Sequence, residues 1–116
     1  MSVRALVTAF AIAFMPSLSI AQSTTGQEIR GAGASSCGQY IEDSDDKDIS
    51  MLYTTWVLGF LSGVNVTNES IKRDMVMLPD SASIKAYLDK YCHDNPLESV
   101  ARGTVHLFLE LHARAK

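Results

Sequence analysis

The two cysteines are the residues of this chain best suited to form a covalent link. Cys37 and Cys92 are its only cysteines, and small exported proteins use such a pair as a disulfide that supports a limited core. A metal centre is the alternative. However, His93, the nearest further ligand, directly follows Cys92 and would point about 100° away on a helix. We therefore expect a Cys37–Cys92 disulfide and no metal or other cofactor.

The histidines and carboxylates do not follow a pattern typical of an enzyme. His106 and His112 are six residues apart in the sequence, which places them on opposite sides of a helix. We find no nucleophile with an evident base, no confronted carboxylate pair and no phosphate-binding glycine loop in the sequence. We therefore expect a non-enzymatic binding protein.

Residues 42–48 (EDSDDKD) contain five acids and one base. A calcium loop would need a glycine near its middle, and this segment has none. We expect a solvated loop in which Asp46 and Asp48 also favour the start of the next helix through its dipole.

The N-terminus has the three regions of a secretory signal peptide. Arg4 provides positive charge, residues 5–15 are apolar, and small residues precede the bond between Ala21 and Gln22. We expect residues 1–21 to be cleaved there, because the apolar run is too short to span a bilayer. The protein is then periplasmic.

The remaining chain fits a flexible leader and one domain. Residues 22–34 (QSTTGQEIRGAGA) are rich in glycine and have little to bury, and residues 35–116 form a single helical domain. The net charge of −3 and the lack of a basic stripe argue against nucleic-acid binding.

Residues 49–65 (ISMLYTTWVLGFLSGVN) carry the central hydrophobic stripe. Eight apolar positions follow helical spacing, which predicts a helix and fits no strand: Ile49, Leu52, Tyr53, Trp56, Val57, Phe60, Leu61 and Val64. Gly59 and Gly63 lie one turn apart, so a second helix could approach the backbone there. We expect residues 65–68 (NVTN) to end this helix, and it has too few turns and too many hydroxyls to span a membrane.

Three further helices are predicted around it. A short one begins near Cys37, capped by Ser35 or Ser36. Another follows Asp80 as N-cap and carries a stripe of Ile84, Leu88, Tyr91 and Cys92. Residues 70–79 form a linker whose Met75 and Met77 either cover the bundle or provide an adaptable binding surface.

The last helix is predicted to start at Asn95 as N-cap, with Pro96 at the first helical position, and to run to about Arg114. Its expected buried positions are Leu97, Val100, Ala101, Thr104, Phe108 and Leu111. The fold class is thus all-α: a small disulfide-stapled bundle of three main helices plus one short N-terminal helix.

The order of these motifs resembles the HdeA/HdeB-like periplasmic acid-stress chaperones. The matching segments, within residues 35–114, are Cys37-Gly-Gln-Tyr40, Trp56-Val57-Leu58-Gly59-Phe60, and Cys92 near the end of the following helix. The resemblance implies that the two cysteines are linked. It also implies a folded homodimer at neutral pH that dissociates in acid and coats unfolding clients.

Simple electrostatics agrees with an acid switch. Neutralising the thirteen carboxylates would leave only positive charges, whose repulsion loosens the bundle. The residues expected to bind clients are Trp56, Val57, Phe60, Leu61, Met75 and Met77.

Two alternatives remain open. The helical architecture resembles, more loosely, the Rap/Tai-type periplasmic immunity proteins that neutralise type VI secretion amidase toxins, and the acids of residues 42–48 could then enter a basic toxin cleft. A structural envelope component is the third possibility. The expected partners are protein clients or one protein partner, with no nucleic acid and no membrane span after signal cleavage.

Overall fold

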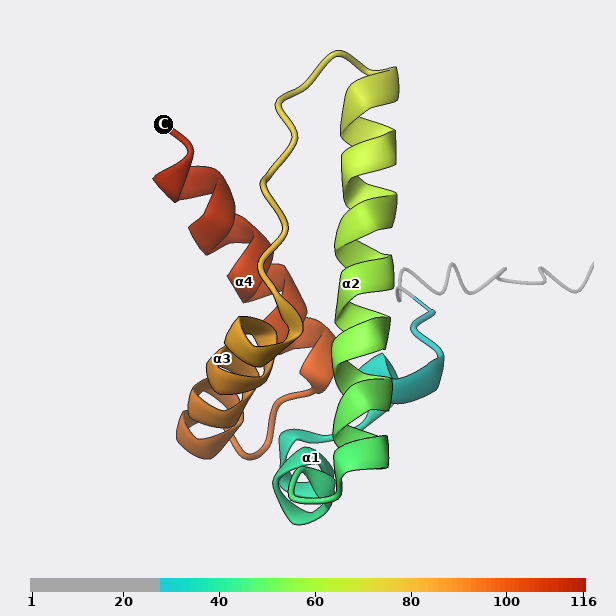
Figure 1. Ribbon diagram of the computed structural model, residues 1–116, viewed down its shortest axis with the longest axis vertical. Helices are drawn as coiled ribbons and strands as arrows, with labels where there is room; N and C mark the ends of the chain where they lie inside the picture. Colours follow the sequence, from blue (N-terminus) through green and yellow to red (C-terminus); the bar gives the residue numbers. More distant parts are fainter. Residues whose placement is uncertain (1–27) are drawn as a thin grey trace, which may run out of the picture.

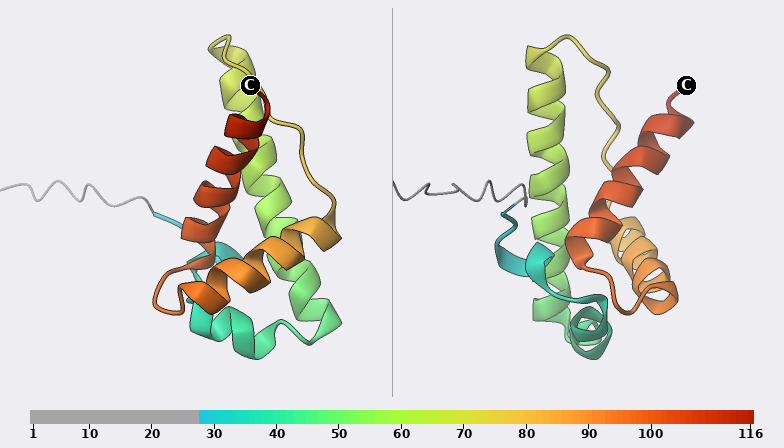
Figure 2. Two further views of the ribbon diagram at one scale, coloured as in Figure 1. Left: turned by 90° about the vertical axis from the view of Figure 1, so that its left-hand side faces the viewer. Right: turned by 180° about the vertical axis from the view of Figure 1, so that it is seen from behind.

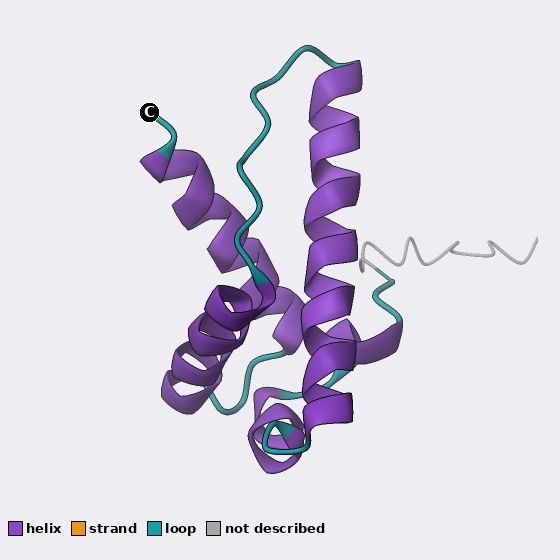
Figure 3. Ribbon diagram, viewed as in Figure 1, coloured by secondary structure: helices purple, strands orange, loops and turns teal. Residues whose placement is uncertain are grey.

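The computed structural model describes residues 28–116, which form one 3-10 helix and four α-helices. The elements are η1 (Gly31–Ala34), α1 (Cys37–Asp43), α2 (Lys47–Ser70), α3 (Ser81–Asp94) and α4 (Val100–Arg114). No strand occurs in this part of the chain (Figure 3). The predicted all-α class is confirmed. The expected signal peptide and its cleavage site lie outside the described residues.

The long helix α2 is the axis of the fold. Helices α3 and α4 lie on one side of it, and α1 and η1 lie near its N-terminal half (Figure 1). The segment between α2 and α3 returns along α2 in both further views (Figure 2). All four helices contribute to one core, whose fully buried side chains include Tyr40, Val57, Leu61, Ile84, Leu88, Val100 and Thr104.

Helix α2 is longer at its C-terminal end than the sequence indicated. Asn65 and Asn68 do not end it, because their side chains bond to the returning segment instead. The Asn65 amide pairs with the backbone of Val76 through two bonds of 2.8 and 2.9 Å. The helix ends at Ser70. Lys72 follows with a left-handed φ of 55°, and the Arg73 N–H closes the turn on the Asn68 carbonyl.

Helix α4 begins later than predicted, with Ser99 as N-cap. The backbone of residues 95–98 instead pairs with the start of α1: the Cys37 N–H bonds to the Glu98 carbonyl at 2.8 Å, and the Gly38 N–H to the Pro96 carbonyl at 3.2 Å. These carbonyls are therefore used in long-range pairing rather than in a helical turn. The prediction that Leu97 is buried is wrong, because 98% of its surface is exposed.

The stripe of α2 is buried along its centre and open at its edges. Tyr53, Val57 and Leu61 are buried, whereas Leu52 is exposed. By length and composition α2 is the one described helix that could cross a membrane, with 28% of its most apolar window buried. A helix that packs in a protein core can have the same length and composition. The three buried side chains of α2 named above belong to this core.

Candidate binding surfaces

The disulfide joins the first turn of α1 to the last turn of α3. Cys37 and Cys92 are bonded at 2.12 Å, and both are fully buried. Ser36 caps α1, accepting a hydrogen bond from the Gln39 N–H. The predicted covalent link is thus confirmed, and it fixes α1 on the bundle.

Trp56 and Phe60, one turn apart on α2, form the aromatic pair of the predicted client-binding stripe. Their rings stack with centroids 5.5 Å apart and planes inclined by 23°. Both side chains are half-buried. Beside Phe60 a depression of about 350 Å³ is lined by Ile29 and by α4 residues that include Arg102 and Val105.

The segment before α1 covers Trp56. The Trp56 indole Nε1–H donates a 2.9 Å hydrogen bond to the Arg30 carbonyl. Gly33 is buried and lies so close that a Cβ there would be 2.1 Å from the indole ring. Residues 31–34, assigned from the sequence to a flexible leader, are therefore ordered as η1, because the glycines allow the backbone to approach the tryptophan.

The remaining predicted client-binding residues do not share one surface. Val57 and Leu61 are fully buried in the core, so they are inaccessible while the bundle is folded. Met75 and Met77 are 55% and 89% exposed on the segment between α2 and α3. Val76 lies between them and is buried.

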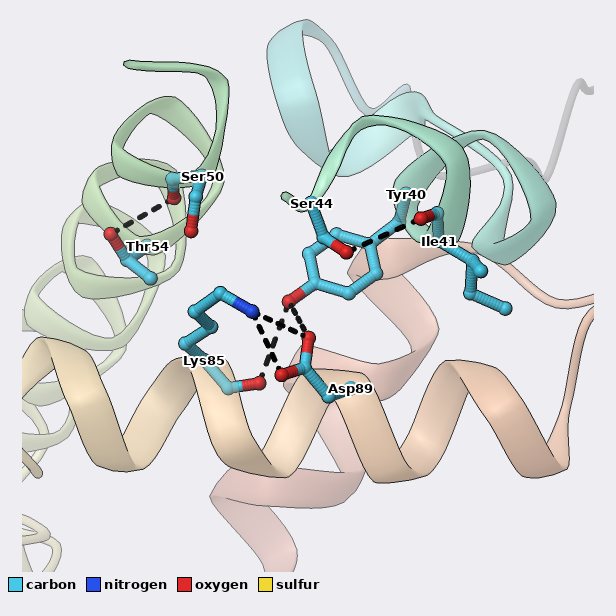
Figure 4. A network of polar contacts seen from close by, with 7 residues as sticks. All are labelled: Tyr40, Ile41, Ser44, Ser50, Thr54, Lys85 and Asp89. Carbon is cyan, nitrogen blue, oxygen red and sulfur yellow. Dashed lines mark hydrogen bonds and ion pairs between the residues drawn. The ribbon is translucent and has the colours of Figure 1, made fainter. Parts of the chain in front are cut away.

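A polar cluster holds α1 on α3 (Figure 4). The Tyr40 hydroxyl donates a 2.7 Å hydrogen bond to the Asp89 carboxylate. Lys85 bonds to the same carboxylate at 2.8 Å, one turn away on α3. Burial and the neighbouring Asp89 carboxylate together raise the pKa of Tyr40 well above its usual range. Tyr40 therefore stays a neutral donor.

A second carboxylate links α1 to α2. Asp43 accepts a 2.8 Å hydrogen bond from the Gln39 side chain and a 3.4 Å hydrogen bond from the Tyr53 hydroxyl. The Tyr53 and Tyr40 rings meet edge to face, with centroids 4.9 Å apart. Asp89 and Asp43 are thus the acceptors of the two tyrosine hydroxyls that link α1 to its neighbours.

The turn between α1 and α2 presents the acidic residues of the segment 42–48. Asp46 is the N-cap of α2 and accepts hydrogen bonds from the Asp48 and Ile49 N–H groups. Four of the acids are exposed: Glu42, Asp45, Asp46 and Asp48. Only part of this charge is used by the helix cap, and the rest faces solvent.

The histidines lie apart from one another. His93 approaches Asp94 at 3.4 Å, His106 lies beside Tyr91, and His112 stacks near Phe108. Within residues 28–116, no group of three or more His, Cys, Asp or Glu side chains could hold a metal ion.

Comparisons with protein-family models, curated proteins and solved structures returned no match to this chain. Sequence reasoning singled out the cysteines and the Trp56–Phe60 pair. It missed the covering segment, although its closely spaced glycines were a signal for close backbone approach. It also missed three cations, Lys72, Arg73 and Lys116, which share one groove.

Proposed function

We propose that the protein is an exported, non-enzymatic chaperone that binds unfolding proteins in acid through the α2 face carrying Trp56 and Phe60. This proposal rests on the observation that the aromatic pair is only half-buried and that a short segment attached through the Arg30 carbonyl covers Trp56. Displacing residues 30–34 would expose Trp56 and its stacked neighbour Phe60. The motif resemblance to the HdeA/HdeB-like chaperones also supports this proposal.

Acid acts on the contacts that hold α1. The carboxylates of Asp89 and Asp43 accept the hydrogen bonds of the Tyr40 and Tyr53 hydroxyls, and neutralising these acceptors weakens both bonds. The remaining charges are then all positive and repel one another. The disulfide keeps α1 tied to α3, so these two helices stay close together when the bundle opens.

The neutral form is proposed to be a homodimer. No charged residue occurs on α2 between Asp48 and Glu69, so a second α2 would meet no like charge. In the described chain, nothing lies within 4 Å of a Cβ placed on Gly59 or Gly63. These glycines leave room for a helix of the second copy. Sedimentation at neutral and acid pH tests this, with dissociation expected only in acid.

The first experiment measures light scattering of an aggregating client with the oxidised protein present. We expect suppression near pH 3, below the usual carboxyl pKa, and none at neutral pH. Emission of Trp56, the sole tryptophan, should shift to the red in acid as its cover leaves. Phe60→Ser should weaken suppression, whereas Leu52→Ser, on the exposed face of α2, should not. Unchanged emission together with no suppression would contradict the proposal.

The exposed acidic turn favours a second candidate function. Glu42, Asp45 and Asp48 form a negative surface at one end of the bundle, which suits a basic protein cleft at neutral pH. An inhibitor or immunity protein of this kind would bind one partner tightly. Asp45→Asn with Asp48→Asn should then reduce neutral-pH capture of that partner and leave acid-dependent suppression unchanged. A structural envelope component would show neither activity.

A further inference from the structure

The end of the molecule where α2 finishes has a local excess of positive charge. Lys72 and Arg73 follow α2, Lys116 follows α4, and all three line one groove of about 600 Å³. Within residues 28–116 none of the three forms an ion pair. Asp74 is the one acid lining the groove. The whole chain has a net charge of −3, whereas the charged residues that line this groove are mostly positive.

Part of the groove lining is apolar. Val64 of α2 and Phe108 and Leu109 of α4 line it. His112 also lines it, and within the described residues its buried Nδ1 has no hydrogen-bond partner. The groove thus offers unpaired cations above a hydrocarbon surface, a combination that suits an anionic headgroup attached to an apolar chain.

Large apolar side chains stand in water next to these cations. Ile71, Met75 and Met77 are 56%, 55% and 89% exposed. The backbone explains why the two methionines are exposed. The Asn65 amide holds the backbone of Val76, the Val76 side chain is buried, and its neighbours Met75 and Met77 therefore face outward. Met77 also borders the last turn of α4, beside Ala115. The cations and the start of the apolar segment consequently belong to one end of the fold, where Figure 2 shows the end of α2, the beginning of the connecting segment and the C-terminus.

The opposite end of α2 carries the acidic turn. Asp46 caps the first turn of α2, and a helix of 24 residues is about 36 Å long. Glu69, in the last turn of α2, adds an acid near the basic end. An anionic surface would therefore attract one end of the molecule and repel the other, which defines a single orientation.

We propose that this basic, methionine-bearing end binds peripherally to a membrane surface that contains anionic phospholipids. Lys72, Arg73 and Lys116 contact headgroup phosphates, while the exposed apolar side chains enter the interface, as in other proteins that combine shallow apolar insertion with electrostatic attraction. A soluble anion would use the groove alone and leave Ile71, Met75 and Met77 in water. The inference concerns neutral pH and is independent of the proposed chaperone function.

The test is co-sedimentation of the purified exported chain with vesicles at neutral pH. Its N-terminus is determined by mass spectrometry, so that all variants are compared with the same start. Vesicles of phosphatidylcholine alone are compared with vesicles that also contain phosphatidylglycerol. We expect binding only to the latter, weakened by high salt.

Two double variants separate the contributions. Lys72→Glu with Arg73→Glu should reduce binding by at least about tenfold. Met75→Ser with Met77→Ser should weaken vesicle binding even at low salt, because these substitutions remove apolar insertion and leave the charges unchanged. The matched control, Lys47→Glu with Lys90→Glu, makes the same charge change at exposed lysines elsewhere and should keep most of the binding. Circular dichroism checks that each variant is folded.

Three outcomes would overturn the proposal. The first is that the wild-type chain binds neither kind of vesicle. If it then binds polyglutamate, the three cations would be assigned to an acidic protein partner. The second is an equal loss in the matched control, because net charge would then explain the binding. The third is displacement by inorganic phosphate beyond that by chloride of equal ionic strength, which would indicate a soluble-anion site.

Discussion

The Tyr40 hydroxyl and the Asp89 carboxylate, 2.7 Å apart, join α1 to α3 in addition to the disulfide. Tyr40→Phe removes the donor and keeps the ring in the core. We expect the free energy of unfolding to fall by about 1 kcal/mol, because Asp89 is left with Lys85 as its partner. Denaturant unfolding at neutral pH measures this, and an unchanged midpoint would show that the hydrogen bond is not stabilising.

Tyr40 also predicts a loss of stability in alkali. Its pKa is raised in the folded protein, first by burial and then by Asp89, whereas in the unfolded chain it is near 10. Above that pH the unfolded chain releases a proton that the folded protein retains, so stability falls as pH rises. Tyr40→Phe should lose stability less steeply above about pH 10. Parallel curves for the two proteins would contradict this.

Gly33 and Gly59 form a matched pair for testing the cover over Trp56. A Cβ at Gly33 would overlap the indole ring, whereas a Cβ at Gly59 meets nothing within 4 Å. Gly33→Ala should reduce stability by about 1–3 kcal/mol through overpacking and shift tryptophan emission to the red. Gly59→Ala, in the middle of α2, should leave emission unchanged and, at protein concentrations low enough for the monomer, raise stability by up to about 1 kcal/mol. Equal effects would mean that residues 31–34 do not cover Trp56 in solution.

The disulfide should contribute a large share of the total stability. Its cysteines are 55 residues apart, for which loop closure in the unfolded chain predicts about 4 kcal/mol. Replacing both Cys37 and Cys92 with Ala should lower the free energy of unfolding by roughly this amount. The reduced wild-type protein is the control and should unfold at a similar denaturant concentration. A loss below about 1 kcal/mol would mean that the link constrains little.

Leu97 and Leu88 test the corrected start of α4. Leu97 is 98% exposed and Leu88 is fully buried. We expect Leu97→Ala to change stability by less than about 0.5 kcal/mol, and Leu88→Ala to reduce it by about 2–5 kcal/mol. Thermal and denaturant unfolding give both values. A large loss at Leu97 would place it in an interface or core that the monomer does not show.

The parts of the fold that local sequence rules govern were predictable. Hydrophobic spacing located α2 and α3, and the short polar side chains of Ser36 and Asp80 marked two helix starts because each accepts a bond from its own first turn. The cysteine pair followed from composition. Helix positions and N-caps depend on residues close in the sequence. The disulfide was predictable because each cysteine has only one possible partner.

The errors lie where distant backbone segments compete with local rules. The helix-start pattern at residues 95–98 gave way to hydrogen bonds with residues 37 and 38. The order of η1 depends on Trp56, which lies more than twenty residues away in the sequence. Of the predicted client-binding group, Trp56 and Phe60 lie together, whereas Val57 and Leu61 became core because helical spacing does not say how wide the buried face is.

The N-caps of two helices, Ser36 and Ser99, are paired in an isolated antiparallel bridge. A chain emerges from the ribosome N-terminus first, so the start of α1 lacks this backbone partner until residue 99 has been made. The pairing therefore delays the assembly of this small domain until α4 begins to emerge. A chain truncated before residue 99 should leave its first helix unanchored and its N-terminal cysteine without a positioned partner.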